Sequence, residues 1–191
     1  MRYDKGHKDD TRRHILDVAS TRFRKSGIAA VGLAGIMSEA GLTNGAFYTH
    51  FASKEELVRE VLNDALTRRE ERHKANLENG IALETTIRDY LSTRHRDRAG
   101  TGCPTAALVA EIARHPKATR DAFTGKVADI ISLMAEQIRQ GSAKERRRKA
   151  IAIYSTMVGA LQLARAVNDR ELSDEILEDA AETAVTIASE S

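Results

Sequence analysis

Residues 42–51 read Leu-Thr-Asn-Gly-Ala-Phe-Tyr-Thr-His-Phe, and this stretch decides the fold. Phe47 and Phe51 stand one helical turn apart, so they can anchor a short helix in a core while its other face stays polar. Just upstream, residues 36–40 predict another short helix. It ends at Gly41, whose missing Cβ permits a sharp turn. Two short helices about a tight turn form a helix-turn-helix, in which the second helix is the reading element.

The wider pattern is Ala40-Gly41-Leu42-Thr43-x-Gly45-x-Phe47-Tyr48-x-His50-Phe51-x-Ser53-Lys54-Glu55-Glu56-Leu57. It resembles the DNA-binding signature of TetR/AcrR-type transcriptional repressors, and the resemblance covers roughly residues 9–60. It implies a repressor that binds double-stranded operator DNA as a homodimer and is released by a small-molecule effector. We therefore predict an all-α protein of about nine helices. An N-terminal arm and a three-helix DNA-binding domain would occupy residues 1–53, and a helical effector-binding and dimerisation domain would occupy residues 54–191.

Composition agrees with a helical protein, because Ala, Leu, Ile, Glu and Arg dominate and there are only two prolines in 191 residues. The net charge of +2 does not by itself indicate a nucleic-acid binder, so the distribution of charge matters more. Residues 171–191 are acidic and contain no Lys or Arg. The start of the chain is basic, with Arg2, Lys5, Lys8, Arg12, Arg13, Arg22, Arg24 and Lys25. This polarity predicts a DNA-facing N-terminal end, with residues 1–8 as a mobile arm.

The single cysteine cannot form an internal disulfide, and no apolar run approaches the ~20 residues of a membrane span. The polar N-terminus also lacks a signal-peptide core. We therefore expect a cytoplasmic protein without a membrane partner. The six histidines show no ligand spacing, so no metal and no cofactor are expected.

Helix signals divide the rest of the chain. Ser53 and Glu56 predict a capping box at the start of a long helix that ends near Asn79 and Gly80. Cys103 and Pro104 predict another helix start, since proline is favoured at the first helical position. The remaining helices are expected at residues 10–26, 81–95, 117–140, 143–168 and 173–189, with a loop at 96–102.

The reading helix contains the strongest candidates for base contacts. A carboxamide can bond bidentately to adenine, which makes Asn44 the best base reader. Gly45 would let the helix start approach DNA closely, and Ala46 would touch a thymine methyl. Thr43 is expected to cap the helix in addition to any contact with DNA.

The resemblance implies further contacts at the matching positions. Tyr48, Thr49 and His50 would also meet DNA, and Tyr48 and Lys54 would bind mainly phosphate. For His50 the alternative is a packed histidine. The sequence departs from the family in residues 31–35, which read Val-Gly-Leu-Ala-Gly where Thr or Ser and often an Arg are usual. Base reading from this helix is therefore in doubt, which shifts weight to Asn44 and the basic arm.

The last two helices each present a wide apolar stripe rich in small residues, which permits close packing. The stripes can be buried within one chain or against a second copy, and the resemblance favours a four-helix homodimer interface. The predicted interface residues are Tyr154, Met157, Val158, Leu161, Leu177, Ala181, Ala184 and Ala188.

The resemblance also implies an effector site among the middle helices. We assign Tyr90, Cys103, Phe123 and Met134 to it as candidates. Beyond Lys74 the only aromatic residues are Tyr90, Phe123 and Tyr154, so an aromatic cage for a bulky cation is not expected.

Cys103 has two interpretations. At a helix N-cap after Arg96 and Arg98, its thiol would have a lowered pKa and could sense oxidants or electrophiles. Alternatively, it is a small buried residue. A hydrolase with Cys103 as nucleophile and His95 or His115 as base is a further alternative.

Other classes of protein have less support in the sequence. No dinucleotide fingerprint, phosphate-binding loop or Gly-x-Ser-x-Gly elbow is present, which argues against an enzyme. A dimeric interaction protein that has lost operator binding would not need the complete reading helix.

Overall fold

The computed structural model describes residues 5–190, with side chains from residue 8 onward. These residues form nine α-helices and two short 3-10 helices and no strand. The elements are α1 (Lys5–Ser26), α2 (Leu33–Glu39), η1 (Asn44–Thr49), α3 (Lys54–Glu78), α4 (Leu83–Tyr90), α5 (Thr93–Asp97), η2 (Ala99–Thr101), α6 (Pro104–Ile112), α7 (Lys117–Gln137), α8 (Ala143–Ala166) and α9 (Arg170–Ser189). The prediction of an all-α protein of about nine helices is confirmed.

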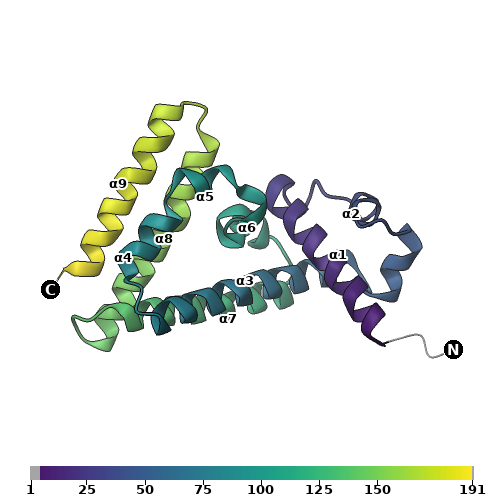
Figure 1. Cartoon of the computed structure of the whole chain (residues 1–191), viewed down its shortest axis with the longest axis horizontal. Helices are drawn as coiled ribbons and strands as arrows, with labels where there is room; N and C mark the ends of the chain where they lie inside the picture. Colours follow the sequence, from purple (N-terminus) through teal and green to yellow (C-terminus); the bar gives the residue numbers. More distant parts are fainter. Residues whose placement is uncertain (1–4, 191) are drawn as a thin grey trace.

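The helices form a small head and a larger body, joined by α3 (Figure 1). We call α1, α2 and η1 the head. We call α4 to α9, together with the part of α3 that lies beyond the head, the body. Helices α3 and α7 pack side by side along one edge of the body, and α8 and α9 pack as a hairpin along another. Helix α6 lies between these edges and the head.

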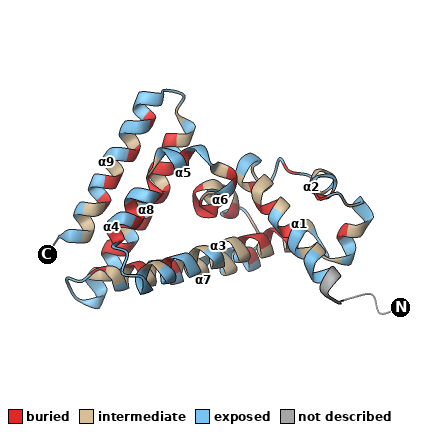
Figure 2. Cartoon of the chain, viewed as in Figure 1, coloured by how far each residue is buried: buried red, intermediate tan, exposed pale blue. Residues whose placement is uncertain are grey.

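Two hydrophobic cores hold this arrangement (Figure 2). In the head core Phe23, Phe47 and Phe51 are almost completely buried, together with Leu108 and Ile112 from α6. Side chains from the start of α3 complete this core, so the head is packed against the body rather than tethered to it. The body core is built by α3, α4, α6, α7, α8 and α9. Burial of these apolar side chains, at about 25 cal/mol per Å², is the main stabilising term for both units.

The capping signals located several helix starts correctly. Ser53 Oγ accepts from the Glu56 N–H at 3.1 Å, and Glu56 Oε2 accepts from the Ala52 N–H at 2.6 Å. Cys103 occupies the N-cap of α6 with Pro104 directly after it. Helix α3 ends at Glu78, with Gly80 at a φ of 68° that favours glycine.

Several predicted helices differ from the structure in their bounds or type. Helix α1 starts at Lys5 rather than residue 10, so only residues 1–4 of the predicted arm, including Arg2, lie outside the described residues. The reading segment is a 3-10 helix. The helix expected at 81–95 ends at Tyr90, and α5 starts anew because Ser92 caps it through the His95 N–H. Helix α9 starts at Arg170, three residues early, because Asp169 caps it.

Within the part of the chain that the structure describes, no helix has both the length and the apolar character needed to cross a membrane.

Candidate DNA-binding face and inner cavity

Aromatic side chains pack together along the reading segment η1 and hold it in position. Phe47 stacks on Phe51 with ring centroids 5.5 Å apart, and the Tyr48 ring meets Phe47 edge-on at 5.2 Å. Gly41 makes the preceding turn with a φ of 69°, a conformation that L side chains rarely adopt. The turn at Gly41 and the aromatic packing therefore fix η1 in position, while its outer surface stays exposed.

All eight residues predicted to bind DNA lie on or beside this segment. Tyr48 is 68% exposed, although it is a large aromatic residue. A Cβ at Gly45 would meet nothing within 4 Å, so the glycine leaves room for a molecule outside the protein. The exposed members are Thr43, Asn44, Gly45, Tyr48 and Thr49, and the half-buried members are Ala46, His50 and Lys54.

Two of these side chains, Thr49 and Lys54, form hydrogen bonds within the protein, and a third, Thr43, lacks the capping hydrogen bond expected of it. Thr43 stands at the N-cap of η1, but its side chain makes no capping hydrogen bond. The Thr49 hydroxyl donates to the Ala46 carbonyl at 2.7 Å. The Lys54 ammonium donates to the Ile28 carbonyl at 2.7 Å, which fixes the lysine stem between α3 and the turn after α1.

His50 is half-buried, and its Nδ1 has no hydrogen-bond partner within the described chain. Burial lowers the pKa of His50, and the nearby positive charges of Lys8 and Arg12 lower it further. Lys8 is exposed at the start of α1, and its positive charge acts on His50 at the end of the reading segment.

Most other basic side chains of α1 are engaged within the protein. Arg12 pairs with Glu60, Arg13 pairs with Asp64, and Arg22 lies 3.4 Å from Glu39. These three arginines thus have carboxylate partners within the chain, and the DNA-facing role of the basic N-terminal end stays a prediction. The three arginines hold the head in place because carboxylates of α2 and α3 lie opposite them.

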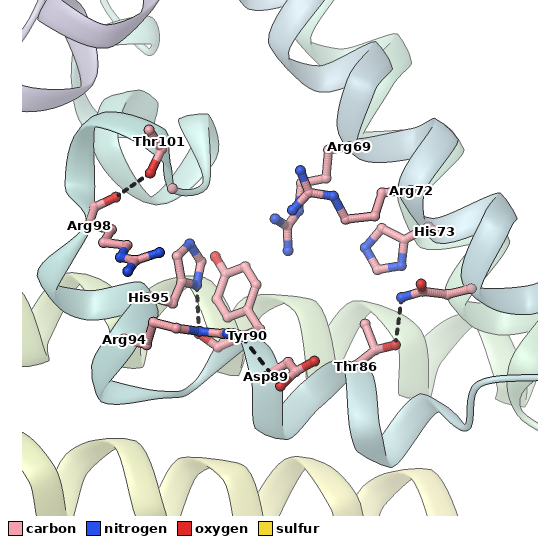
Figure 3. Close-up of a pocket in the computed structure, with 12 residues that line it drawn as sticks. Arg69, Arg72, His73, Thr86, Asp89, Tyr90, Arg94, His95, Arg98 and Thr101 are labelled. Carbon is pink, nitrogen blue, oxygen red and sulfur yellow. Dashed lines mark hydrogen bonds and ion pairs between the residues drawn. The ribbon is translucent and has the colours of Figure 1, made fainter.

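A cavity of about 260 Å³ lies inside the body, between α3 and the segment from α4 to η2 (Figure 3). This inner cavity is lined from α3 by Arg69, Arg72, His73 and Asn76 and from α4 by Thr86, Asp89 and Tyr90. Its remaining wall is formed by Arg94, His95, Arg98, Thr101 and Gly102. In Figure 3, Arg69 and Arg72 face Tyr90, His95 and Arg98 across the space.

The two histidines of the cavity are neutral near pH 7. Burial is the largest cause that lowers the pKa of His73 to about 4, with Arg69 and Arg72 adding to it. Burial also lowers the pKa of His95 to about 4. The hydrogen bond to the Tyr90 carbonyl favours the charged ring and raises the pKa, but this effect is smaller than that of burial. His95 Nε2 accepts from the Cys103 N–H at 2.9 Å, so its Nδ1 carries the proton and donates to the Tyr90 carbonyl at 2.6 Å.

The candidate effector residues occupy different places. Tyr90 lines the inner cavity, and Cys103 is completely buried behind His95. Phe123 is half-buried and packs against both cores, and Met134 is completely buried in the body core.

Sequence reasoning missed the charged wall contributed by α3. Its four residues follow the spacing i, i+3, i+4 and i+7, which places them on one helical face. This polar stripe, which runs beside the apolar stripe of the same helix, is the pattern in the sequence that could have indicated the wall.

The thiol of Cys103 experiences opposing influences. Burial raises its pKa, but the Arg69 guanidinium, the Tyr90 hydroxyl and the backbone N–H groups of Thr105 and Ala106 outweigh burial and lower the pKa overall. The positive field thus comes from Arg69. Arg96, which the sequence suggested, is bound to Asp97, Ser173 and Asp174.

Neither candidate base bonds to the thiol. His95 Nε2 takes the backbone N–H of Cys103, and His115 Nδ1 lies 2.9 Å from a Glu55 carboxylate oxygen. The histidines thus have structural partners in the positions where a Cys-dependent hydrolase would need a free base.

Seven of the eight candidate interface residues are already buried within the single chain. Met157, Leu161 and Ala184 are completely buried in the body core, and the Tyr154 hydroxyl donates to Thr105 Oγ1 at 2.9 Å. Ala188 is half-buried. The predicted stripes therefore join the hairpin to its own body.

Comparison with known proteins assigns this architecture to a family. Residues 15–61 match the family model of bacterial regulatory proteins of the tetR family, and residues 82–180 match the tetracyclin repressor-like C-terminal domain. The chain belongs to the TetR family. Members of this family are transcriptional regulators.

Curated relatives match part of this TetR-family chain. The regulator AcrR of Shigella flexneri is 42% identical over 60 residues, which is 31% of this chain and 28% of AcrR. The repressor KstR2 of Rhodococcus jostii is 29% identical over 92 residues, 48% of this chain and 45% of KstR2. The chain thus spans less than half the length of these relatives.

Solved TetR-family structures share the whole fold. The reduced form of NemR from E. coli superposes with a TM-score of 0.77 at 23% identity and covers 92% of this chain and 95% of NemR. A TetR-family regulator from Agrobacterium tumefaciens gives a TM-score of 0.75 at 20% identity, covering 92% of this chain and 98% of that one.

Proposed function

We propose that this TetR-family chain is a repressor that binds a palindromic operator as a homodimer and is released when a small molecule enters the inner cavity. Residues 1–53 would form the DNA-binding domain and residues 54–191 the effector-binding and dimerisation domain. The observation that carries this proposal is that the cavity wall is bonded directly to the head. Arg24 Nη1 in α1 donates to the Gly102 carbonyl at 3.0 Å, and Gly102 lines the cavity.

The DNA-binding part of the proposal rests on exposed polar groups in a fixed frame. Asn44 is exposed at the start of η1, where a carboxamide can reach an adenine edge in the major groove. Tyr48 presents an exposed hydroxyl on the same segment, and the exposed Lys8 adds positive charge that acts on His50. Such groups bind phosphates and position the reader.

Tight packing couples the cavity to the head. A Cβ at Gly100 would meet Lys25 Cε in α1 at 2.7 Å. A Cβ at Gly102 would meet His95 Nε2 at 2.9 Å. The η2 segment therefore fits closely between the cavity and α1. An effector that displaces this wall would shift the head, and a coupling of ~1–3 kcal/mol is enough for regulation.

The α8–α9 hairpin would form the homodimer through its outer face. On this hairpin Ile151, Leu163 and Leu172 are 43%, 59% and 42% exposed, while Ile176 and Ala180 are half-buried. Where such exposed apolar side chains lie together on one face, they mark an interaction surface. We place the interface on these residues, beside the inward stripes named from sequence.

A thiol-sensing repressor is the second candidate. The lowered pKa of Cys103 beside Arg69 favours the thiolate, which is the reactive form. Because the side chain is completely buried, a reagent would have to reach it through the protein.

The proposal is tested by selecting bound fragments from random duplex DNA and measuring their affinity by gel shift at increasing salt. We expect selected sites with two-fold symmetry and an affinity that falls steeply with salt. A monomeric protein, or one with no preference among duplexes, would contradict it.

A further inference from the structure

Positive charge is concentrated on the walls of the inner cavity. Four arginines line it, two from α3 and two from the α5–η2 segment, namely Arg69, Arg72, Arg94 and Arg98. The only carboxylate in the lining is that of Asp89, and it lies 3.8 Å from Arg94. Both histidines are neutral near pH 7, so the lining is strongly cationic at that pH.

Three of these guanidiniums lack a carboxylate partner within residues 8–190. Arg72 and Arg98 are exposed residues of the cavity lining and form no ion pair within the described residues. Arg69 is half-buried, its guanidinium lies 4.6 Å over the Tyr90 ring, and its Nε is buried without a hydrogen-bond partner. A buried cation without a hydrogen-bonded counter-charge is costly, so an anion at this position would stabilise the protein.

A second hollow of the protein differs from the inner cavity in its ionic contacts. The second hollow, between α1 and α3, shares Arg69 and Arg72 with it but is otherwise balanced. There Arg68 pairs with Asp17 at 2.7 Å and with Asp64 at 2.9 Å. Arg69 and Arg72 therefore lie between the two hollows, and Arg94 and Arg98 add their charge on the side of the inner cavity.

The geometry of the donors indicates the class of ligand. Guanidinium groups present planar pairs of N–H donors that match carboxylate and phosphate oxygens bidentately. The Tyr90 ring offers an apolar surface on the same wall, while its hydroxyl lies against the Cys103 thiol. The volume of about 260 Å³ lies just below the roughly 300–1,000 Å³ usual for small-molecule sites.

We propose that the inner cavity binds a small organic oxyanion, a carboxylate or phosphate ester, through Arg69, Arg72 and Arg98. This inference deepens the proposed function, on which its regulatory meaning rests. The anion would join α3 to the α5–η2 segment. Through the Arg24–Gly102 hydrogen bond, this same segment is joined to α1.

Calorimetric titration of the full chain with matched probes tests the charge requirement. Benzoate and phenyl phosphate represent the two oxyanions, and benzamide and benzylamine represent neutral and cationic analogues. At constant ionic strength, we expect measurable binding of at least one oxyanion and at least about tenfold weaker binding of both analogues. Equal affinity for benzamide, or no oxyanion binding at millimolar concentration, would overturn the proposal.

Two cavity variants and a control locate the site. Arg72→Gln and Arg98→Gln change exposed side chains, so the fold should persist. Each should weaken oxyanion binding about tenfold, because a charge-assisted hydrogen bond is lost. Arg120→Gln removes the same charge from an exposed position on α7 outside the cavity lining and should leave affinity unchanged. Equal losses in all three variants would indicate general charge attraction and overturn the assignment.

Gel shifts with the selected operator separate this inference from the proposed function. If the protein binds operator but only neutral compounds release it, the repressor function stands and the oxyanion site is wrong. If benzoate binding depends on Arg98 but no duplex is preferred, the oxyanion site stands and the repressor function is wrong.

Discussion

Arg24 and Gly102, 78 positions apart in the sequence, are joined by a 3.0 Å hydrogen bond from the guanidinium to the carbonyl oxygen. Burial lowers the pKa of Arg24 more than the nearby Cys103 thiolate raises it, yet an arginine stays charged under all physiological conditions. The same guanidinium donates from Nε to the Ser20 carbonyl at 3.0 Å. It therefore connects the end of α1 to the wall of the inner cavity.

We expect Arg24→Met to uncouple the cavity from the head. Operator affinity should stay within a few-fold of the original, while the ratio of benzoate affinities between free and operator-bound protein should fall towards one, because the direct link is lost. Titration calorimetry with and without operator measures this ratio. Arg22→Met is the matched control, since Arg22 pairs with Glu39 inside the head. An unchanged ratio in Arg24→Met would mean that coupling runs elsewhere.

We expect Asn44→Ala and Lys54→Ala to affect DNA binding differently. Asn44→Ala should reduce discrimination at one base pair per half-site by ~1–3 kcal/mol, because a base-edge contact is lost. Lys54→Ala should weaken binding to all duplexes alike. Competition gel shifts with single-base operator variants measure both effects. Lys54 also bonds to the Ile28 carbonyl, so a thermal melt must show that the variant is folded. Uniform losses in both variants would refute the assignment of Asn44.

We expect Leu163→Glu to dissociate the homodimer. Leu163 is 59% exposed on α8, so a charge there should not disturb the single chain but should oppose burial against a second copy. Analytical ultracentrifugation measures the change in mass. Leu77→Glu, at a 38% exposed site near the end of α3, controls for added charge outside the hairpin. A Leu163→Glu dimer of unchanged affinity would place the interface on another face.

We expect the free energy of unfolding to fall as pH is lowered from about 6.5 to about 4. The pKa of His73 and of His95 is about 4 in the folded chain, below the ordinary value of 6.5, so the unfolded chain binds protons first. The loss is at most about 1.4 kcal/mol per pH unit for each histidine, and less for the partly solvated His95. Urea unfolding from pH 7.5 to 4 measures it. His73→Gln should flatten the slope, and an unchanged slope would show that other groups dominate.

We expect Cys103 to react with iodoacetamide more slowly than glutathione at pH 7. The thiolate is favoured by Arg69, but complete burial denies the reagent access. Mass spectrometry of the native protein over time gives the rate, and the protein unfolded in urea serves as the control. Alkylation faster than that of glutathione would instead support the thiol-sensing alternative.

The head is largely a product of local sequence. The Phe47–Phe51 spacing, the Gly41 turn and the Ser53 cap each act over a few residues, so the sequence alone identifies the reading segment and its exposed face. The same local rules placed Pro104 at the start of α6. They did not anticipate the break at Leu91 and Ser92, because the helical apolar spacing runs up to Leu91 and no glycine or proline follows it before Gly100.

The inner cavity and the outer face of the hairpin depend on tertiary structure. Arg69 and Arg98 converge only when α3 packs against the segment from α4 to η2, and no local pattern records that contact. Likewise, periodicity puts Leu161 and not Leu163 on the apolar stripe of α8, but it does not state whether this stripe packs within the chain or against a second copy. The packed body buries the first completely and leaves the second 59% exposed. Local propensity sets where helices begin and end, whereas burial depends on which helices meet.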